Sequence, residues 1–138
     1  MPLEKVFIVS KIERLKDNLS KIKSKLLLSD QEILSSADHL ASLERYFQLV
    51  VDYAIDINHH FIKNKELNVP DDLQSTFTVL GDNEILTNDF ADRISRSVGL
   101  RNRLVHQYED VKPAVFLEHL RKNLGDYEEY ARQILRQI

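Results

Sequence analysis

The chain has 138 residues, of which 43% are hydrophobic and 30% charged, and its formal net charge is −3. This length suits one domain whose core needs no disulfide, so we expect residues 1–138 to form a single domain. The sequence has no Cys, which excludes thiolate zinc sites and cysteine nucleophiles and suits a reducing cytoplasm. Three Gly, three Pro and no Trp favour an all-α protein over a turn-rich β protein. The net charge argues against a general nucleic-acid coat, but a local basic patch can still bind RNA.

The N-terminal segment predicts a helix rather than a targeting signal. Its apolar run, Val6 to Val9, is too short for a signal peptide or a membrane span, so we expect a cytoplasmic protein without membrane association. Apolar residues then recur every three or four positions, which predicts the first main helix: Val9, Ile12, Leu15, Leu19, Ile22 and Leu26.

The longest predicted element runs unbroken from Ser29 or Asp30 to about Asn64. Ser29 can cap it, and Glu32 places a negative charge in its first turn. Two sets of apolar residues recur every seven positions: Ile33, Leu40, Phe47, Ala54 and Phe61, and Leu43, Val50 and Ile57. We therefore expect this helix to be buried in a bundle, with part of it covered by a second chain.

The second half of the chain predicts one short helix and two main ones. A break around Pro70 precedes a short helix over Leu73–Leu80, closed by Gly81. Thr87 or Asn88 caps the third main helix, and Gly99 predicts a bend within it.

The last main helix starts after Asp110, with Pro113 in its first turn, and Gly125 interrupts it only mildly. The prediction is an all-α bundle of four main helices and one short helix.

Two arginines, an asparagine, a histidine and a tyrosine lie within the eight residues from Arg101 to Tyr108. RNA cleavage without a metal needs a base with a pKa near neutral and a fixed cation for the phosphate. His106 and Arg101 supply these two groups, and Asn102 lies four positions before His106, where it can orient the imidazole ring or touch substrate. Arg103 is a further candidate for positioning substrate. The alternative is a polar helix end in which Tyr108 is half-buried and nothing is catalysed.

The spacing of Arg101 and His106 predicts a homodimer. Five residues at about 100° each place them roughly 140° apart around a straight helix, too far for a tight pair. Two copies packed about a two-fold axis can bring both histidines and both arginines to one cleft.

The segment Arg101-Asn102-x-Leu104-x-His106-x-Tyr108 resembles the R-x4-6-H signature of HEPN ribonucleases, in the R-x4-H-x-Y form of the HepT-like toxin family. Upstream segments also resemble that family in the same order: Leu43-Glu44-Arg45, Asp56 to His60, Phe77 to Leu80, and Ile85-Leu86. The resemblance spans nearly the whole chain.

The resemblance implies a HEPN-type homodimer that is a metal-independent endoribonuclease, toxic when unopposed and needing no cofactor. It implies a minimal nucleotidyltransferase antitoxin as partner, and Tyr108 as the residue that this antitoxin modifies with AMP. The alternative function is a non-catalytic HEPN module that only binds such a nucleotidyltransferase.

A second polar cluster lies on the long predicted helix. Asp52, Asp56 and His60 fall on one helical face beside His59, and such ligands permit a divalent cation. We favour the simpler interpretation, in which they are polar residues lining a cleft or the end of the bundle, because no further residues mark a metal site. We therefore predict no metal.

Overall fold

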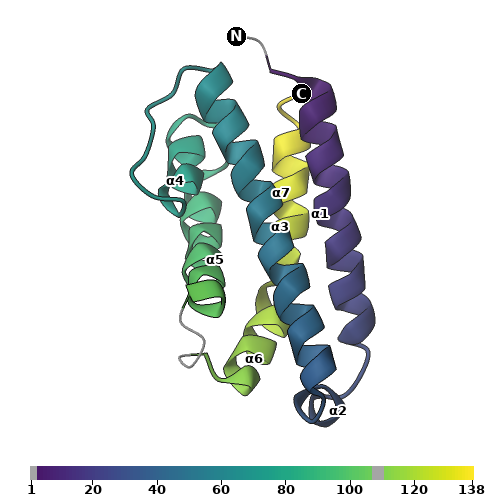
Figure 1. Ribbon diagram of the computed structural model, residues 1–138. Helices are drawn as coiled ribbons and strands as arrows, with labels where there is room; N and C mark the ends of the chain where they lie inside the picture. Colours follow the sequence, from purple (N-terminus) through teal and green to yellow (C-terminus); the bar gives the residue numbers. More distant parts are fainter. Residues whose placement is uncertain (1–2, 107–110) are drawn as a thin grey trace.

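The computed structural model describes residues 3–106 and 111–138. Within these ranges the chain forms seven α-helices and no strand. Figure 1 shows α1 and α3 side by side as the two long rods, with α7 beside them, α4 and α5 on the other side of α3, and α6 at the end near α2. The helices are α1 (Lys5–Lys25), α2 (Asp30–Leu34), α3 (Ala37–Asn64), α4 (Ser75–Asp82), α5 (Asn88–His106), α6 (Pro113–Asn123) and α7 (Gly125–Leu135). The all-α prediction is confirmed, whereas the predicted number of helices is wrong because two elements are divided.

The first division separates α2 from α3, where an unbroken helix was predicted from Ser29 to Asn64. Ser29 caps α2 through a capping box, accepting from the Glu32 N–H at 3.1 Å while Glu32 accepts from the Ser29 N–H at 3.2 Å. The Ser35 hydroxyl then donates to the Gln31 carbonyl at 2.8 Å, and the extended Ser36 caps α3 by accepting from the His39 N–H. Serine hydroxyls compete with the helical ladder for backbone partners, so this pair ends one helix and starts another.

The second division separates α6 from α7 at Leu124, within the predicted last helix. Pro113 occupies the first turn of α6 as expected.

Arg121 fixes α6 against the chain after α1. Its side chain contacts Asp30 at 2.6 Å and donates to the carbonyls of Leu26 and Leu28, each at 2.9 Å.

Gly81 does not close α4, as the sequence suggested, but lies inside it. A Cβ at Gly81 would lie 2.7 Å from the Ala91 Cβ of α5. The missing side chain therefore lets α4 and α5 pack closely. The helix α5 itself continues through Gly99 to His106.

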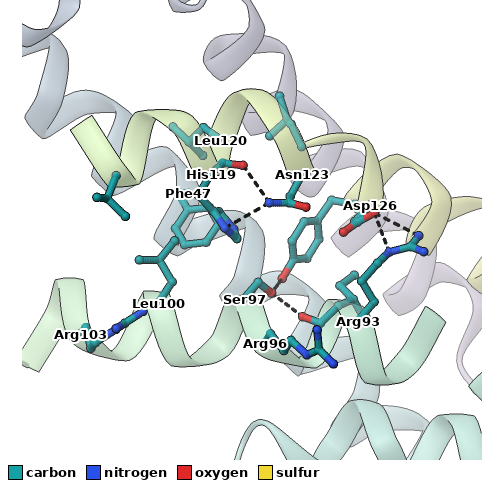
Figure 2. Close-up of a pocket in the computed structure, with 14 residues that line it drawn as sticks. Phe47, Arg93, Arg96, Ser97, Leu100, Arg103, His119, Leu120, Asn123 and Asp126 are labelled. Atoms are coloured by element: carbon teal, nitrogen blue, oxygen red, sulfur yellow. Dashed lines mark hydrogen bonds and ion pairs between the residues drawn. The ribbon is translucent and has the colours of Figure 1, made fainter. Parts of the chain in front are cut away.

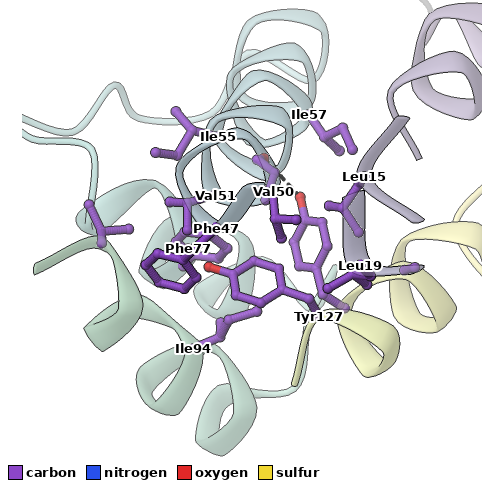
Figure 3. Packing of buried hydrophobic residues seen from close by; sticks show 14 of the residues in the cluster. Leu15, Leu19, Phe47, Val50, Val51, Ile55, Ile57, Phe77, Ile94 and Tyr127 are labelled. Atoms are coloured by element: carbon purple, nitrogen blue, oxygen red, sulfur yellow. Dashed lines mark hydrogen bonds between the residues drawn. The ribbon is translucent and has the colours of Figure 1, made fainter. Parts of the chain in front are cut away.

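The predicted heptad positions lie in the core, Ile33 on α2 and the others on α3, with Leu40 only partly buried. They pack with buried residues of α1, α4, α5 and α7 (Figure 3). In α1, Ile8 is buried and Val9 only partly, a shift of one residue from the predicted stripe. Tyr130 of α7 donates to Asn58 Oδ1 at 2.6 Å, and Asn58 donates to Thr76 Oγ1 at 3.0 Å. This buried chain of hydrogen bonds joins α7, α3 and α4. No helix in the described ranges has the length and hydrophobicity to cross a membrane.

Candidate active site

Arg101, the predicted phosphate-binding cation, faces Asp52 across the contact between α5 and α3. Its Nε–H donates to Asp52 Oδ1 at 2.9 Å, and its Nη2 lies 2.8 Å from the same oxygen. The Arg101 side chain is only 14% exposed and that of Asp52 33%. Such a partly buried, charge-assisted contact fixes the plane of the guanidinium.

Asn102 forms the third part of this arrangement. The Arg101 Nη1 donates to Asn102 Oδ1 at 3.0 Å. A guanidinium has five N–H donors, and each of the three nitrogens of Arg101 contacts Asp52 or Asn102, which occupies three of these donors. Donors therefore remain for the oxygens of a phosphate. Sequence spacing related Asn102 to His106, but in the structure its carbonyl oxygen accepts from Arg101.

His106 is the last residue of α5, but its side chain lies outside the described structure, as do residues 107–110 with Tyr108. The roles of His106 and Tyr108 therefore stay predictions. Because α5 is unbroken, positions 101 and 106 are roughly 140° apart around the helix, as expected for a straight segment.

The four residues of the predicted polar cluster on α3 do not share one partner. Asp52 binds Arg101, and Asp56 forms an ion pair with Lys11 of α1 at 2.9 Å. His60 accepts the Glu4 N–H at 3.0 Å, and burial is the main cause that lowers its pKa. His59 is exposed. Within the described ranges, no three His, Asp or Glu side chains are grouped closely enough to hold a metal ion.

A groove of about 340 Å³ runs along α5 on the side where α6 and α7 approach it. We call it the α5–α6 groove (Figure 2). Arg93, Arg96 and Arg103 line it from α5, and His119 and Asn123 line it from α6. Arg103, a predicted substrate-positioning residue, is exposed at this groove. The sequence analysis missed the other four residues.

A periodic signal for the groove was present in the sequence. Arg93, Arg96, Leu100 and Arg103 are spaced by three, four and three residues, and therefore share one face of a helix. His119 and Asn123 are four apart and likewise neighbours on α6. The sequence did not show that α6 packs near α5. This packing brings the two faces together in one site.

Two curated relatives are nucleases by name. The chain is 35% identical over 132 residues to the tRNA nuclease HepT of Aphanizomenon flos-aquae, covering 96% of this chain and 90% of that protein. It is 25% identical over 122 residues to the mRNA nuclease HepT of Shewanella oneidensis, covering 88% and 84%.

Solved structures share the fold. A tri-AMPylated HEPN toxin of Shewanella oneidensis in complex with an MNT antitoxin has a TM-score of 0.89 at 24% identity, covering 96% of this chain and 99% of that one. A mutant of the toxin–antitoxin MntA–HpeT has a TM-score of 0.83 at 25% identity, with coverage of 96% and 99%.

The family model described as ribonuclease HepT-like matches residues 15–134, which include α2 to α6, all of α7 but its last residue, and the C-terminal half of α1. The residues that carried the resemblance in the sequence lie within this match. The chain therefore belongs to the ribonuclease HepT-like family.

Proposed function

We propose that this protein is a metal-independent endoribonuclease and the toxin of a toxin–antitoxin pair. The observation that carries the proposal is the partly buried Arg101, held by Asp52 and Asn102 on the same helix that ends in His106. A cation fixed before substrate arrives stabilises developing phosphate charge without reorganising. The names of the curated relatives, a tRNA nuclease and an mRNA nuclease, support RNA as the substrate.

The chemistry follows from what each side chain can do. His106 takes the proton from a ribose 2′-hydroxyl, whose oxygen attacks the adjacent phosphorus. The bond from phosphorus to the 5′-oxygen breaks, and a protonated histidine returns a proton to that oxygen. The products are a 2′,3′-cyclic phosphate and a 5′-hydroxyl. A guanidinium does not exchange protons in catalysis, so Arg101 acts only on the phosphate charge, while Asn102 and Arg103 position the substrate.

The working unit we propose is a homodimer in the cytoplasm. Positions 101 and 106 diverge around α5, so one copy alone presents its arginine and histidine in different directions. A two-fold axis beside the C-terminal end of α5 brings the two sets of residues to one cleft.

We also propose a minimal nucleotidyltransferase antitoxin as partner and Tyr108 as the residue that it adenylylates. Support comes from a relative of the same fold, which is described as a tri-AMPylated toxin in complex with an MNT antitoxin. An adenylyl group on Tyr108 adds negative charge two residues from His106, where it repels the RNA backbone and pairs with Arg101 or Arg103.

The deciding experiment is the substitution His106→Ala. The matched control is His59→Ala, because His59 is exposed on α3. The nuclease predicts that His106→Ala loses RNA cleavage and toxicity while staying folded, and that His59→Ala keeps both. A non-catalytic module that binds a nucleotidyltransferase predicts no cleavage by the natural protein and unchanged partner binding by His106→Ala. Cleavage that persists in purified His106→Ala would contradict the proposed mechanism.

A further inference from the structure

The α5–α6 groove combines an apolar floor with a cationic rim. Leu100 and Leu120 lie at its floor and are almost fully buried, and Val115 at its edge is 55% exposed. Three arginines line it from α5: Arg93, Arg96 and Arg103. A hydrocarbon ligand would contact only the apolar floor, and a simple anion would contact only the arginines of the rim. The groove suits a ligand with a flat apolar part and a phosphate.

The charges of the rim are unequally neutralised. Arg93 is held by Asp126 of α7, with its Nη2 3.2 Å from Oδ1. Among the described residues Arg96 forms an ion pair only with Asp92, one helical turn earlier, and both side chains are more than 70% exposed, so the pair is weak. Arg103 is exposed and makes no ion pair within the described residues. Arg96 and Arg103 are therefore the cations available to a phosphate.

On the α6 side of the groove, the hydrogen bonds between His119 and Asn123 determine which of their atoms can donate to a ligand and which can accept from it. Asn123 Nδ2 lies 3.3 Å from both the carbonyl oxygen and the Nδ1 of His119 (Figure 2). Since a carbonyl only accepts, the amide nitrogen must face it, so Nδ1 accepts as well and the ring hydrogen lies on Nε2. Burial is the largest cause that lowers the His119 pKa, and Arg103 lowers it further against the opposing effect of Asp126. A neutral His119 can donate from Nε2, and Asn123 Oδ1 can accept.

The groove also adjoins the proposed cleavage site. Arg103 and His106 are three residues apart on α5, so their positions are neighbours on one side of the helix. A chain bound with one phosphate at Arg103 therefore passes the end of α5 that carries His106. The volume of about 340 Å³ lies near the lower end of small-ligand sites. It accommodates one unpaired nucleotide rather than a base-paired stem, and unpaired bases are the usual targets of sequence-specific RNA recognition.

We propose that the α5–α6 groove binds one unpaired ribonucleotide of the RNA substrate next to the scissile phosphate, with its base over Leu100 and Val115 and its phosphate at Arg96 and Arg103. This inference rests on the proposed ribonuclease function and adds a specificity site to it. His119 and Asn123 contact the edge of the base, so they decide which base is preferred.

The first test is a titration of the ¹⁵N-labelled full-length protein with AMP, GMP, CMP and UMP in turn, followed by NMR. We expect the amide signals of Ser97, Leu120 and Asn123 to shift, with one nucleotide binding more tightly than the others. Inorganic phosphate, as the reference anion, should bind more weakly because it lacks a base. Shifts that map elsewhere, or equal affinity for phosphate and all four nucleotides, would overturn the proposal.

The second test uses matched variants. Val115→Trp fills the groove from an exposed position, and Val69→Trp changes an 82% exposed valine away from it. Arg96→Ala removes a rim charge, and Arg132→Ala removes a paired, exposed arginine from α7. We expect nucleotide binding to be about tenfold weaker in Val115→Trp and in Arg96→Ala, because the first fills the groove and the second removes one charge-assisted contact. Both control variants should bind nucleotides as the natural protein does. Unchanged binding in both groove variants would contradict the proposal.

Cleavage patterns separate this inference from the proposed function. If His106-dependent cleavage of a random-sequence RNA pool is observed but Val115→Trp leaves the distribution of cut sites unchanged, the groove proposal fails and the nuclease stands. If nucleotides bind in the groove but no His106-dependent cleavage occurs, the nucleotide site is supported and the nuclease mechanism is contradicted.

Discussion

Arg101 and Asp52 lie 49 positions apart in the sequence, yet the Arg101 Nε–H donates to Asp52 Oδ1 at 2.9 Å between α5 and α3. The pair links the candidate catalytic helix to the longest helix of the bundle. From its place at a partly buried helix contact we propose a role for Asp52 that the sequence did not reveal, which is to orient the arginine before RNA binds.

Asp52→Asn should lower the rate of RNA cleavage on the order of a hundredfold, because the misplaced guanidinium no longer meets the transition state. The loss should fall on kcat more than on KM. Asp56→Asn is the matched control, since Asp56 lies one turn away and pairs with Lys11 instead. Single-turnover kinetics on both variants measure the effect, and equal losses would assign Asp52 a merely structural role.

Cleavage should persist in excess EDTA and leave 2′,3′-cyclic phosphate ends, because the mechanism that we propose uses His106 and Arg101 without a metal. Mass spectrometry of the RNA fragments identifies the ends. Loss of cleavage on chelation, with recovery on adding Mg²⁺ or Mn²⁺, would refute this mechanism.

The protein should be a dimer at micromolar concentration, and two inactive variants should complement each other. In a composite cleft, a mixed dimer of Arg101→Ala and His106→Ala retains one intact arginine and one intact histidine. We expect the mixture to regain activity that neither variant has alone. Light scattering gives the mass, and a fully active monomer would exclude the shared cleft.

Co-expression with the proposed nucleotidyltransferase antitoxin should add adenylyl mass to Tyr108, and Tyr108→Phe should escape neutralisation. Intact-mass measurement and peptide mapping locate the modification. If Tyr108→Phe is neutralised as well as the natural protein, control must come from masking of the site by the partner's surface.

Gly81→Ala should destabilise the fold by about 1–3 kcal/mol, because the added Cβ would lie 2.7 Å from the Ala91 Cβ and force α4 and α5 apart. Gly125→Ala is the control: no atom lies within 4 Å of its added Cβ, and Ala favours the helix by up to about 1 kcal/mol. Thermal unfolding of both variants measures the difference. Equal stability of Gly81→Ala and the natural protein would show that the helices adjust freely.

The sequence by itself determined the helical class and the main core positions, because a helix records its buried face as a local three- and four-residue period. It also determined the motif from Arg101 to Tyr108, whose spacing is a property of one segment. The prediction from the sequence missed the helix boundary at Ser35 and Ser36. There the side-chain hydroxyls form hydrogen bonds with backbone groups that a continuous helix would pair with each other.

Only the tertiary structure decided which residues meet across helices. Nothing local distinguishes Asp52, which binds Arg101, from Asp56, which binds Lys11, since both lie on the same face of α3. The α5–α6 groove exists only because α6 returns past α5 and places His119 opposite Arg103. Such contacts depend on the relative placement of whole helices, which is set by the packing of the entire core rather than by the periodicity of any one segment.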